Sequence, residues 1–255
     1  MRFIDTHTHL YLPEFDADRD EVVNRAVRDG ISKMLLPNID LQSAEQLQSA
    51  VNRYPGLCYP MIGLHPTSVK EDYLAQLSEI ERLAGKHKYI AIGEIGIDLY
   101  WDKTFLNEQI IALRRQIAFA IRCSIPIVIH SRDAFPEVFS VLDEFKGETL
   151  RGVFHAFTGT LNDAEKVISL GFMMGIGGIV TFKNSGLDKI VKEVGPANLI
   201  LETDSPYLAP VPFRGKRNES SYICIINKKL AEIFGLSEDE VASITYLNST
   251  RLFNL

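Results

Sequence analysis

The 255-residue sequence predicts an α/β fold of the (β/α)8 TIM-barrel class. Eight short apolar runs alternate with longer segments of helical periodicity along almost the whole chain. The runs are continuous more than alternating, which is typical of strands that are covered on both faces. An open doubly wound sheet is the competing fold, but no GxGxxG follows the first run and no GxxxxGK[ST] occurs anywhere.

The first half of the chain predicts four strands, at residues 2–10, 31–37, 57–64 and 89–97. Asp18 and Glu21 have the spacing of a capping box at the start of the first helix, and Gly30 ends that helix. The next helices are expected at residues 40–54, 71–83 and 104–122. The last of these has apolar residues three and four apart, which indicates one buried helical face.

The second half predicts four more strands, at residues 127–130, 153–157, 172–180 and 199–202. The intervening helices are expected at residues 135–145, 162–170 and 187–194. Glycines within the seventh strand indicate close backbone packing. Two final helices, residues 221–234 and 237–246, are expected to lie against the outer wall and close the ring. No linker, repeat or low-complexity segment interrupts the chain, so we expect one domain over residues 1–255.

The charge and the N-terminal sequence limit the possible partners. Lys and Arg total 27 and Asp and Glu total 33, a net charge of -6, so no global positive field attracts the protein to duplex DNA or an anionic membrane. Any nucleic-acid contact must therefore be local. Neither a signal peptide nor a membrane-spanning run is found, and we expect a cytoplasmic protein with no membrane partner. The three cysteines have no metal-binding spacing and are expected to be reduced thiols.

Polar residues follow or end the predicted strands. In a barrel, the carboxyl ends of all strands meet at one mouth, where such folds keep their chemistry. Five of the six histidines are expected there, and His87 is expected in a solvated loop. The residues expected at the mouth are His7, His9, His65, Glu94, His130, His155 and Asp204.

Together these residues predict a metal site. His7 and His9 are two apart, so both rings project to the same side of a strand, and Glu94 is a carboxylate within an apolar run that needs a cation or a hydrogen-bond partner. Each residue alone is as easily a satisfied core histidine or a paired acid. The set exceeds what one tetrahedral ion needs, so two divalent ions are expected, with Zn, Mn and Mg left open.

Seven motifs in sequence order resemble one known family. They are DTHTH at residues 5–9, GLHP at 63–66, IGEIGID at 92–98, IHSRD at 129–133, VFHAFTG at 153–159, LETDSPY at 201–207 and RGKRNE at 214–219. Together they look like the TatD family of metal-dependent deoxyribonucleases, within the amidohydrolase superfamily. The usual Asn-Glu-Pro of that family is Asn218-Glu219-Ser220 here, which changes a loop but no expected ligand.

The resemblance implies a TIM barrel that hydrolyses phosphodiester bonds in nucleic acid, commonly as a 3'-to-5' exonuclease on single strands. The positions that match the family's metal ligands are His7, His9, Glu94, His130, His155 and Asp204, with Glu94 in the bridging position. His65 matches a histidine near the reacting phosphate.

Basic residues near the mouth are candidates for phosphate binding. Arg132 and Lys183 follow strands five and seven, and Arg214 begins a cluster with Lys216 and Arg217 after strand eight. Solvated loop charge is the alternative interpretation of the cluster. Aromatic side chains that we expect at the rim to stack on unpaired bases, or to pack, are Tyr100, Trp101, Phe182, Tyr207 and Phe213.

The expected mechanism is metal-assisted phosphodiester hydrolysis. Asp204 accepts or relays the proton of the attacking water, while His65 and Arg132 stabilise the developing charge. The main alternative is a hydrolase of small carboxylic esters, lactones or amides that uses the same metals, since the fold hosts many reactions. A metal-stabilised binding module without turnover is a third possibility, in which Asp204 and His65 would have no task.

Overall fold

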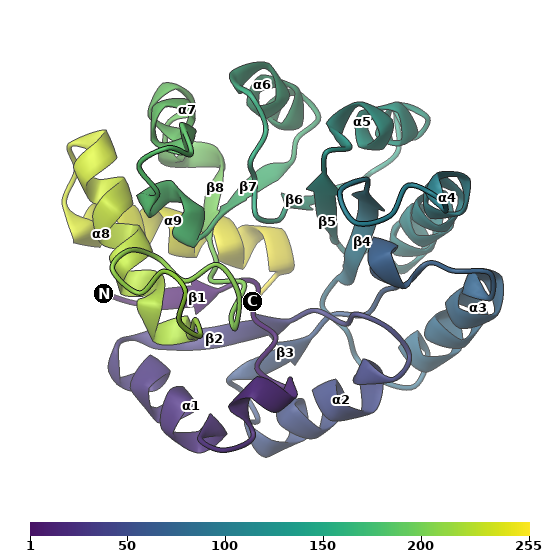
Figure 1. Cartoon of the computed structure of the whole chain (residues 1–255), viewed down its shortest axis with the longest axis horizontal. Helices are drawn as coiled ribbons and strands as arrows, with labels where there is room; N and C mark the ends of the chain where they lie inside the picture. The colour runs from purple at the N-terminus through teal and green to yellow at the C-terminus, as the bar shows by residue number, and fades with distance from the viewer.

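The computed structural model describes residues 1–255, and its eight strands are arranged around a central axis with the helices outside them (Figure 1). All neighbouring strands are parallel and form two sheets, one of three strands and one of five. In chain order the strands are β1 Phe3–Asp5, β2 Ile31–Leu36, β3 Cys58–Pro60, β4 Ile92–Asp98, β5 Ile127–Arg132, β6 Gly152–Phe154, β7 Met173–Ile176 and β8 Leu199–Leu201.

Backbone hydrogen bonds join the two sheets at both seams. Between β3 and β4, Gly93 N donates to the Ile62 carbonyl at 2.9 Å, and between β8 and β1, Thr6 N donates to the Leu201 carbonyl at 3.1 Å. Isolated parallel bridges accompany both contacts, one of them between Thr8 and Ser205. The predicted barrel is confirmed, and every strand end therefore reaches the same mouth.

The helices lie close to their predicted positions. They are α1 Arg19–Arg28, α2 Ser43–Arg53, α3 Tyr73–Ala84, α4 Leu106–Cys123, α5 Phe135–Asp143, α6 Leu161–Ser169, α7 Leu187–Val194, α8 Ile223–Phe234 and α9 Glu238–Phe253. On α4, Leu113, Ile117 and Ala120 are buried at spacings of four and three, so the apolar face predicted for this helix packs on the barrel. None of the helices is long and apolar enough to span a membrane.

The predicted capping box of the first helix is wrong. Asp18 stands at the N-cap of α1 but makes no capping hydrogen bond. Its carboxylate instead accepts two bonds from Arg217, at 2.7 and 2.6 Å. Sequence spacing cannot anticipate this, because the competing guanidinium comes from the other end of the chain.

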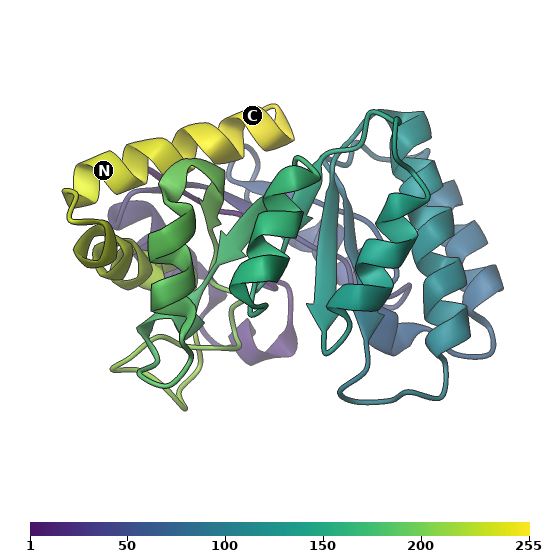
Figure 2. The same cartoon turned by 90° about the horizontal axis from the view of Figure 1, so that it is seen from above.

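The expectation for the last helix is also corrected. Figure 2 shows α9 lying across one end of the barrel, on the side opposite to the loops that follow the strands. Leu252 and Phe253 of α9 pack there on residues inside the barrel, among them Ile4 of β1, Val128 of β5 and Ile200 of β8. The C-terminal helix thus plugs the amino-terminal end of the barrel and leaves only the opposite end open to ligands.

Candidate metal centre

The predicted ligands converge on Glu94, which lies on β4 and is 2% exposed. Oε2 of Glu94 lies 3.0 Å from Nε2 of His7 and 3.9 Å from Nε2 of His9. Oε1 lies 2.7 Å from Nδ1 of His130, 3.3 Å from Nε2 of His65 and 3.8 Å from Nε2 of His155. The two oxygens of one carboxylate therefore face different sets of imidazoles.

Close contact between β4 and β5 sets the position of this carboxylate. Gly96 pairs with His130 across the two strands and has φ +152°, and a Cβ there would lie 1.8 Å from the His130 carbonyl oxygen. Only glycine permits this approach. The glycine two residues after Glu94 thus allows the β4 carboxylate and the β5 imidazole to reach the same point.

The other side of the centre is built at the seam between β1 and β8. Asp204 N donates to the His7 carbonyl at 2.8 Å, and His9 N donates to the Ser205 carbonyl at 2.8 Å. Oδ1 of Asp204 then lies 3.5 Å from Nε2 of His9, 3.7 Å from Nε2 of His155 and 3.8 Å from Nε2 of His7. The loop after β8 therefore brings Asp204 to the histidines of β1.

Three groups of side chains have ligand atoms close enough together to hold an ion. The groups are His7 with His155 and Asp204, His7 with His9 and Glu94, and His65 with Glu94 and His130. Both ring nitrogens of His7 are buried without a hydrogen bond, and its ring stacks on that of His155 at a centroid distance of 3.4 Å. Buried imidazoles without partners, next to carboxylates, are the donor set that Zn²⁺ or Mn²⁺ takes.

Two carboxylates that the sequence analysis left without a role contact the histidines from behind. Oδ2 of Asp98 lies 2.9 Å from Nε2 of His130, and Oε1 of Glu202 lies 3.0 Å from Nδ1 of His155. Both acids stand inside motifs already noted, so an acid near a ligand histidine was the available signal. Carboxylates in this position fix the orientation and basicity of a ligating imidazole.

Gly175 on β7 makes room for one of these acids. A Cβ at Gly175 would lie 2.1 Å from Oε2 of Glu202. The close packing expected for the glycines of the seventh strand is confirmed, with a buried side chain as the neighbour in this case. The glycine-rich strand thus helps to hold the acid behind His155.

The surroundings shift the pKa values of the central groups in opposite directions. Burial disfavours the charge on Glu94, but His65, His7 and His155 hold the pKa of that carboxyl well below its usual range. Burial likewise opposes ionisation of His155, yet Glu202, Glu94 and Asp204 raise its pKa to about 10. Burial and the neighbouring His155 lower the pKa of His7. Protons therefore neutralise part of the acid cluster in the metal-free centre, and bound cations would displace them.

His65 is positioned as a proton donor. The backbone N–H of Thr67 donates to Nδ1 of His65 at 3.2 Å, so Nδ1 carries no proton. In the neutral ring Nε2 then carries the proton, and this atom faces Glu94. An N–H directed into the centre suits the phosphate-side role that the family resemblance implies for His65 better than metal ligation.

A cleft of about 850 Å³ opens above the centre. Arg132, Arg214 and Lys216 line it, whereas Lys183 lines an adjoining groove of about 670 Å³. None of these four cations takes part in an ion pair. Arg217 does not join them, because it is paired with Asp18. The basic cluster predicted after strand eight is therefore divided between the cleft and a structural ion pair.

Aromatic side chains from two loops stand at the rim. Tyr100 and Trp101 are 55% and 68% exposed, and the guanidinium of Arg132 lies 4.0 Å from the Tyr100 ring centroid. Backbone N–H groups of both aromatic residues donate to Asp98, which also contacts His130. One acid thus connects the rim to the centre.

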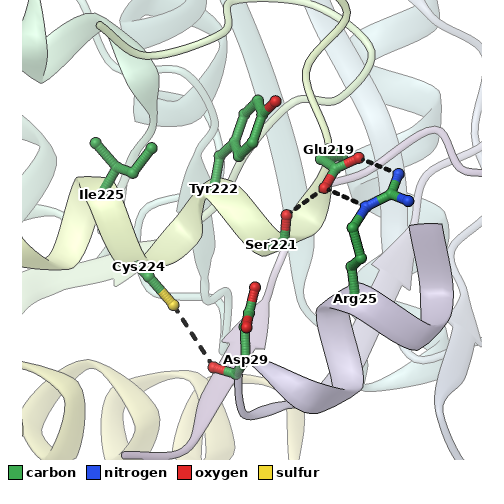
Figure 3. Close-up of a pocket in the computed structure, with 7 residues that line it drawn as sticks. All are labelled: Arg25, Asp29, Glu219, Ser221, Tyr222, Cys224 and Ile225. Atoms are coloured by element: carbon green, nitrogen blue, oxygen red, sulfur yellow. Dashed lines mark hydrogen bonds and ion pairs between the residues drawn. The ribbon is translucent and has the colours of Figure 1, made fainter. Parts of the chain in front are cut away.

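A second cavity, on the outside of the barrel, has no free charged group. Figure 3 shows Arg25 and Ser221 both bonded to Glu219, and Cys224 directed toward Asp29. Arg25 contacts both carboxylate oxygens of Glu219, at 2.9 and 2.6 Å. Asn218, just before Glu219, donates to the carbonyls of Thr203 and Tyr207 and so supports the loop that carries Asp204. These residues of the RGKRNE motif stabilise the fold around the site.

A family model described as TatD related DNase matches residues 4–254 of the chain. The chain belongs to this family. Among its TatD-family relatives, the metal-dependent hydrolase YabD of Bacillus subtilis is 37% identical over 98% of each chain. The 3'-5' ssDNA/RNA exonuclease TatD of Erwinia tasmaniensis is 31% identical over 98% of this chain and 99% of its own. The crystal structure of the TatD homologue YjjV from Escherichia coli K12 superposes with a TM-score of 0.93, at 29% identity, and covers 100% of this chain and 98% of that one.

These matches confirm the predicted family and the predicted enzyme class, a metal-dependent hydrolase. They leave the number and identity of the ions, and the role of each residue around Glu94, as predictions. Those assignments are taken up next as a proposal.

Proposed function

We propose that this TatD-family enzyme hydrolyses phosphodiester bonds of single-stranded nucleic acid from the 3' end. The observation that supports this most is the combination of a buried acid and histidine centre with unpaired cations on the walls of the cleft above it. In a protein of net charge -6, such cations are the feature that attracts a polyanion locally. The printed activity of the Erwinia tasmaniensis relative supports the polarity and the single-strand preference.

Two divalent ions fit the donor set. Oε2 of Glu94 faces His7 and His9, and Oε1 faces His130, so one carboxylate is placed to bridge two ions. The proposed ligands are His7, His9, Glu94, His130, His155 and Asp204. Bound ions of this kind activate water and neutralise charge on phosphate oxygens. Mixed imidazole and carboxylate ligation favours Zn or Mn, and Mg fits if phosphate and water complete its shell.

Asp204 is the proposed proton acceptor. Its side chain is 14% exposed, compared with 3% for Glu94, so it is the carboxylate that a water in the cleft meets first. Burial opposes its ionisation, but His155, His9 and His7 lower its pKa, which keeps it deprotonated at neutral pH. A deprotonated carboxylate in contact with the cleft can take the proton of the attacking water.

His65 and Arg132 are the proposed donors to the phosphate. Nε2–H of His65 faces the centre from one side, and Arg132 lines the cleft above it. A guanidinium binds two phosphate oxygens at once, and its planar face can remain against Tyr100. Together these residues would orient the phosphodiester before attack.

A time course on end-labelled single- and double-stranded oligonucleotides tests the proposal, with each divalent ion added back to stripped protein. We expect metal-dependent shortening of the single strand from its 3' end. A parallel panel of nitrophenyl carboxylic esters, lactones and amides tests the alternative hydrolase. Turnover of that panel with intact oligonucleotides would overturn the nuclease assignment.

A further inference from the structure

We propose that the groove beside the catalytic cleft binds the part of a single-stranded nucleic acid that extends beyond the bond being cleaved. We call it the β7–β8 groove. This inference rests on the proposed function and adds the path of the substrate. The groove encloses about 670 Å³ and is lined by Thr158 and Gly159 after β6, residues 179–190 after β7, and Leu208, Val211 and Arg214 after β8.

The β7–β8 groove continues directly from the catalytic cleft. Phe182, Leu208 and Arg214 line both spaces. A strand whose phosphate lies over Glu94 can therefore pass between these side chains without leaving the surface. Neither space alone accounts for all the unpaired cations, since Arg132 and Lys216 belong to the cleft and Lys183 to the groove.

The chemistry of the groove matches an unpaired strand. Lys183 and Asn184 are exposed, and their side chains make no hydrogen bond or ion pair within the chain. The Arg214 guanidinium lies over the Phe182 ring at 4.6 Å, a face on which a base can also stack. Leu208 and Val211 are 38% and 45% exposed although they are apolar. Cations beside exposed apolar faces are what a charged backbone with unstacked bases requires.

The two walls of the groove are tied together. Thr181 Oγ1 accepts a hydrogen bond from Val211 N at 2.9 Å and donates to the Gly178 carbonyl at 2.7 Å. A Cβ at Gly178 would lie 2.1 Å from the Leu208 carbonyl oxygen, so the two loops are in close backbone contact. The groove therefore keeps its shape before any ligand binds, which reduces the ordering cost of binding.

A strand in this groove is the part retained after each cleavage. If the 3'-terminal nucleotide lies in the cleft under Arg132 and Trp101, the 5' portion leaves through the opposite wall, where Arg214 and Lys183 lie. Contacts to the retained portion would keep the enzyme on its substrate between cuts.

The test compares Lys183→Ala combined with Asn184→Ala against the control Lys192→Ala on α7, an exposed lysine outside the groove. Substrates are a dinucleotide and a single strand of about 15 nucleotides, a length within the usual site size for such proteins. We expect the double variant to raise KM for the long strand about threefold more than KM for the dinucleotide. Its salt dependence should also flatten by about 0.7 per lost phosphate contact, with the control unchanged in both.

Equal KM values and salt slopes for the double variant and the control on the long strand would overturn the groove assignment while leaving the nuclease function intact. Fluorescence anisotropy of a labelled single strand with metal-free protein gives a second readout that needs no turnover. Weaker binding by the double variant than by the control supports the groove even if no cleavage is found. Failure of the proposed function is recognised separately, by absence of cleavage of either substrate by the unmodified enzyme.

Discussion

Nδ1 of His155 lies 3.0 Å from Oε1 of Glu202, and both side chains are buried. The acid also accepts the backbone N–H of Ala156 at 2.6 Å, so it is fixed relative to the strand that carries the histidine. With Nδ1 facing a carboxylate, Nε2 is the nitrogen that faces Glu94 and Asp204. The relationship makes Glu202 a positioning residue for the proposed metal centre.

Glu202→Gln should therefore weaken metal binding without removing a ligand. An amide is a poorer acceptor than a carboxylate and leaves His155 less basic and less well oriented, so we expect a loss of about 10- to 100-fold in metal affinity. Metal titration of the stripped protein measures it. Glu219→Gln is the matched control, because Glu219 pairs with Arg25 in the outer cavity. Equal affinities in both variants would assign Glu202 to folding alone.

Glu94→Ala should reduce the metal content to one ion or none. No other side chain presents one oxygen to His7 and another to His130. Elemental analysis of the purified variant gives the number of ions per chain. Two ions retained per chain would refute the bridging role.

Asp204→Asn should preserve the fold and lower kcat by about 100- to 10,000-fold. The amide cannot accept the proton that the mechanism assigns to this carboxylate. Steady-state kinetics at saturating metal, together with circular dichroism, separates loss of the proton acceptor from loss of structure. A rate close to that of the unmodified enzyme would remove Asp204 from the reaction.

Arg132→Lys should weaken the reaction although the charge is kept. An ammonium cannot bind two phosphate oxygens in a plane or stack in the same way on Tyr100. We expect a higher KM for oligonucleotides. Arg217→Lys is the control, since Arg217 is paired with Asp18 and should change thermal stability alone. Matching KM values in the two variants would place Arg132 outside phosphate recognition.

The metal-free protein should lose thermal stability as the pH rises from 6.5 to about 10. Burial disfavours the imidazolium of His155, but Glu202, Glu94 and Asp204 outweigh it and raise its pKa from 6.5 to about 10. A folded-state pKa above the unfolded value gives stability that is complete below the lower value and is lost through the higher one. Melting temperatures of chelator-treated protein across this range test the sign. Saturating metal should reduce the dependence, because a cation replaces the proton. A melting temperature that is constant or rises over the range would contradict it.

Local patterns in the sequence were sufficient for most of the fold. The apolar face of α4 was predictable from spacing, because helical period and burial on one side leave the same mark in any context. The seven residues expected at the mouth were likewise predictable, since parallel strands place their carboxyl ends together. Strand lengths were less predictable. β1, β3 and β7 are shorter than their apolar runs because the chain leaves the hydrogen-bonded ladder before the run ends.

What the sequence by itself determined was the barrel, the family and the set of side chains that meet at its open end. Only the tertiary structure decided which partner each of them has. Asp18 pairs with Arg217 instead of capping its own helix, and Glu202 stands behind His155 because Gly175 leaves space for it. α9 closes the far end of the barrel instead of its wall. The physical reason is that hydrogen bonds and packing depend on distance in space, and residues far apart along the chain become neighbours only when the ring closes.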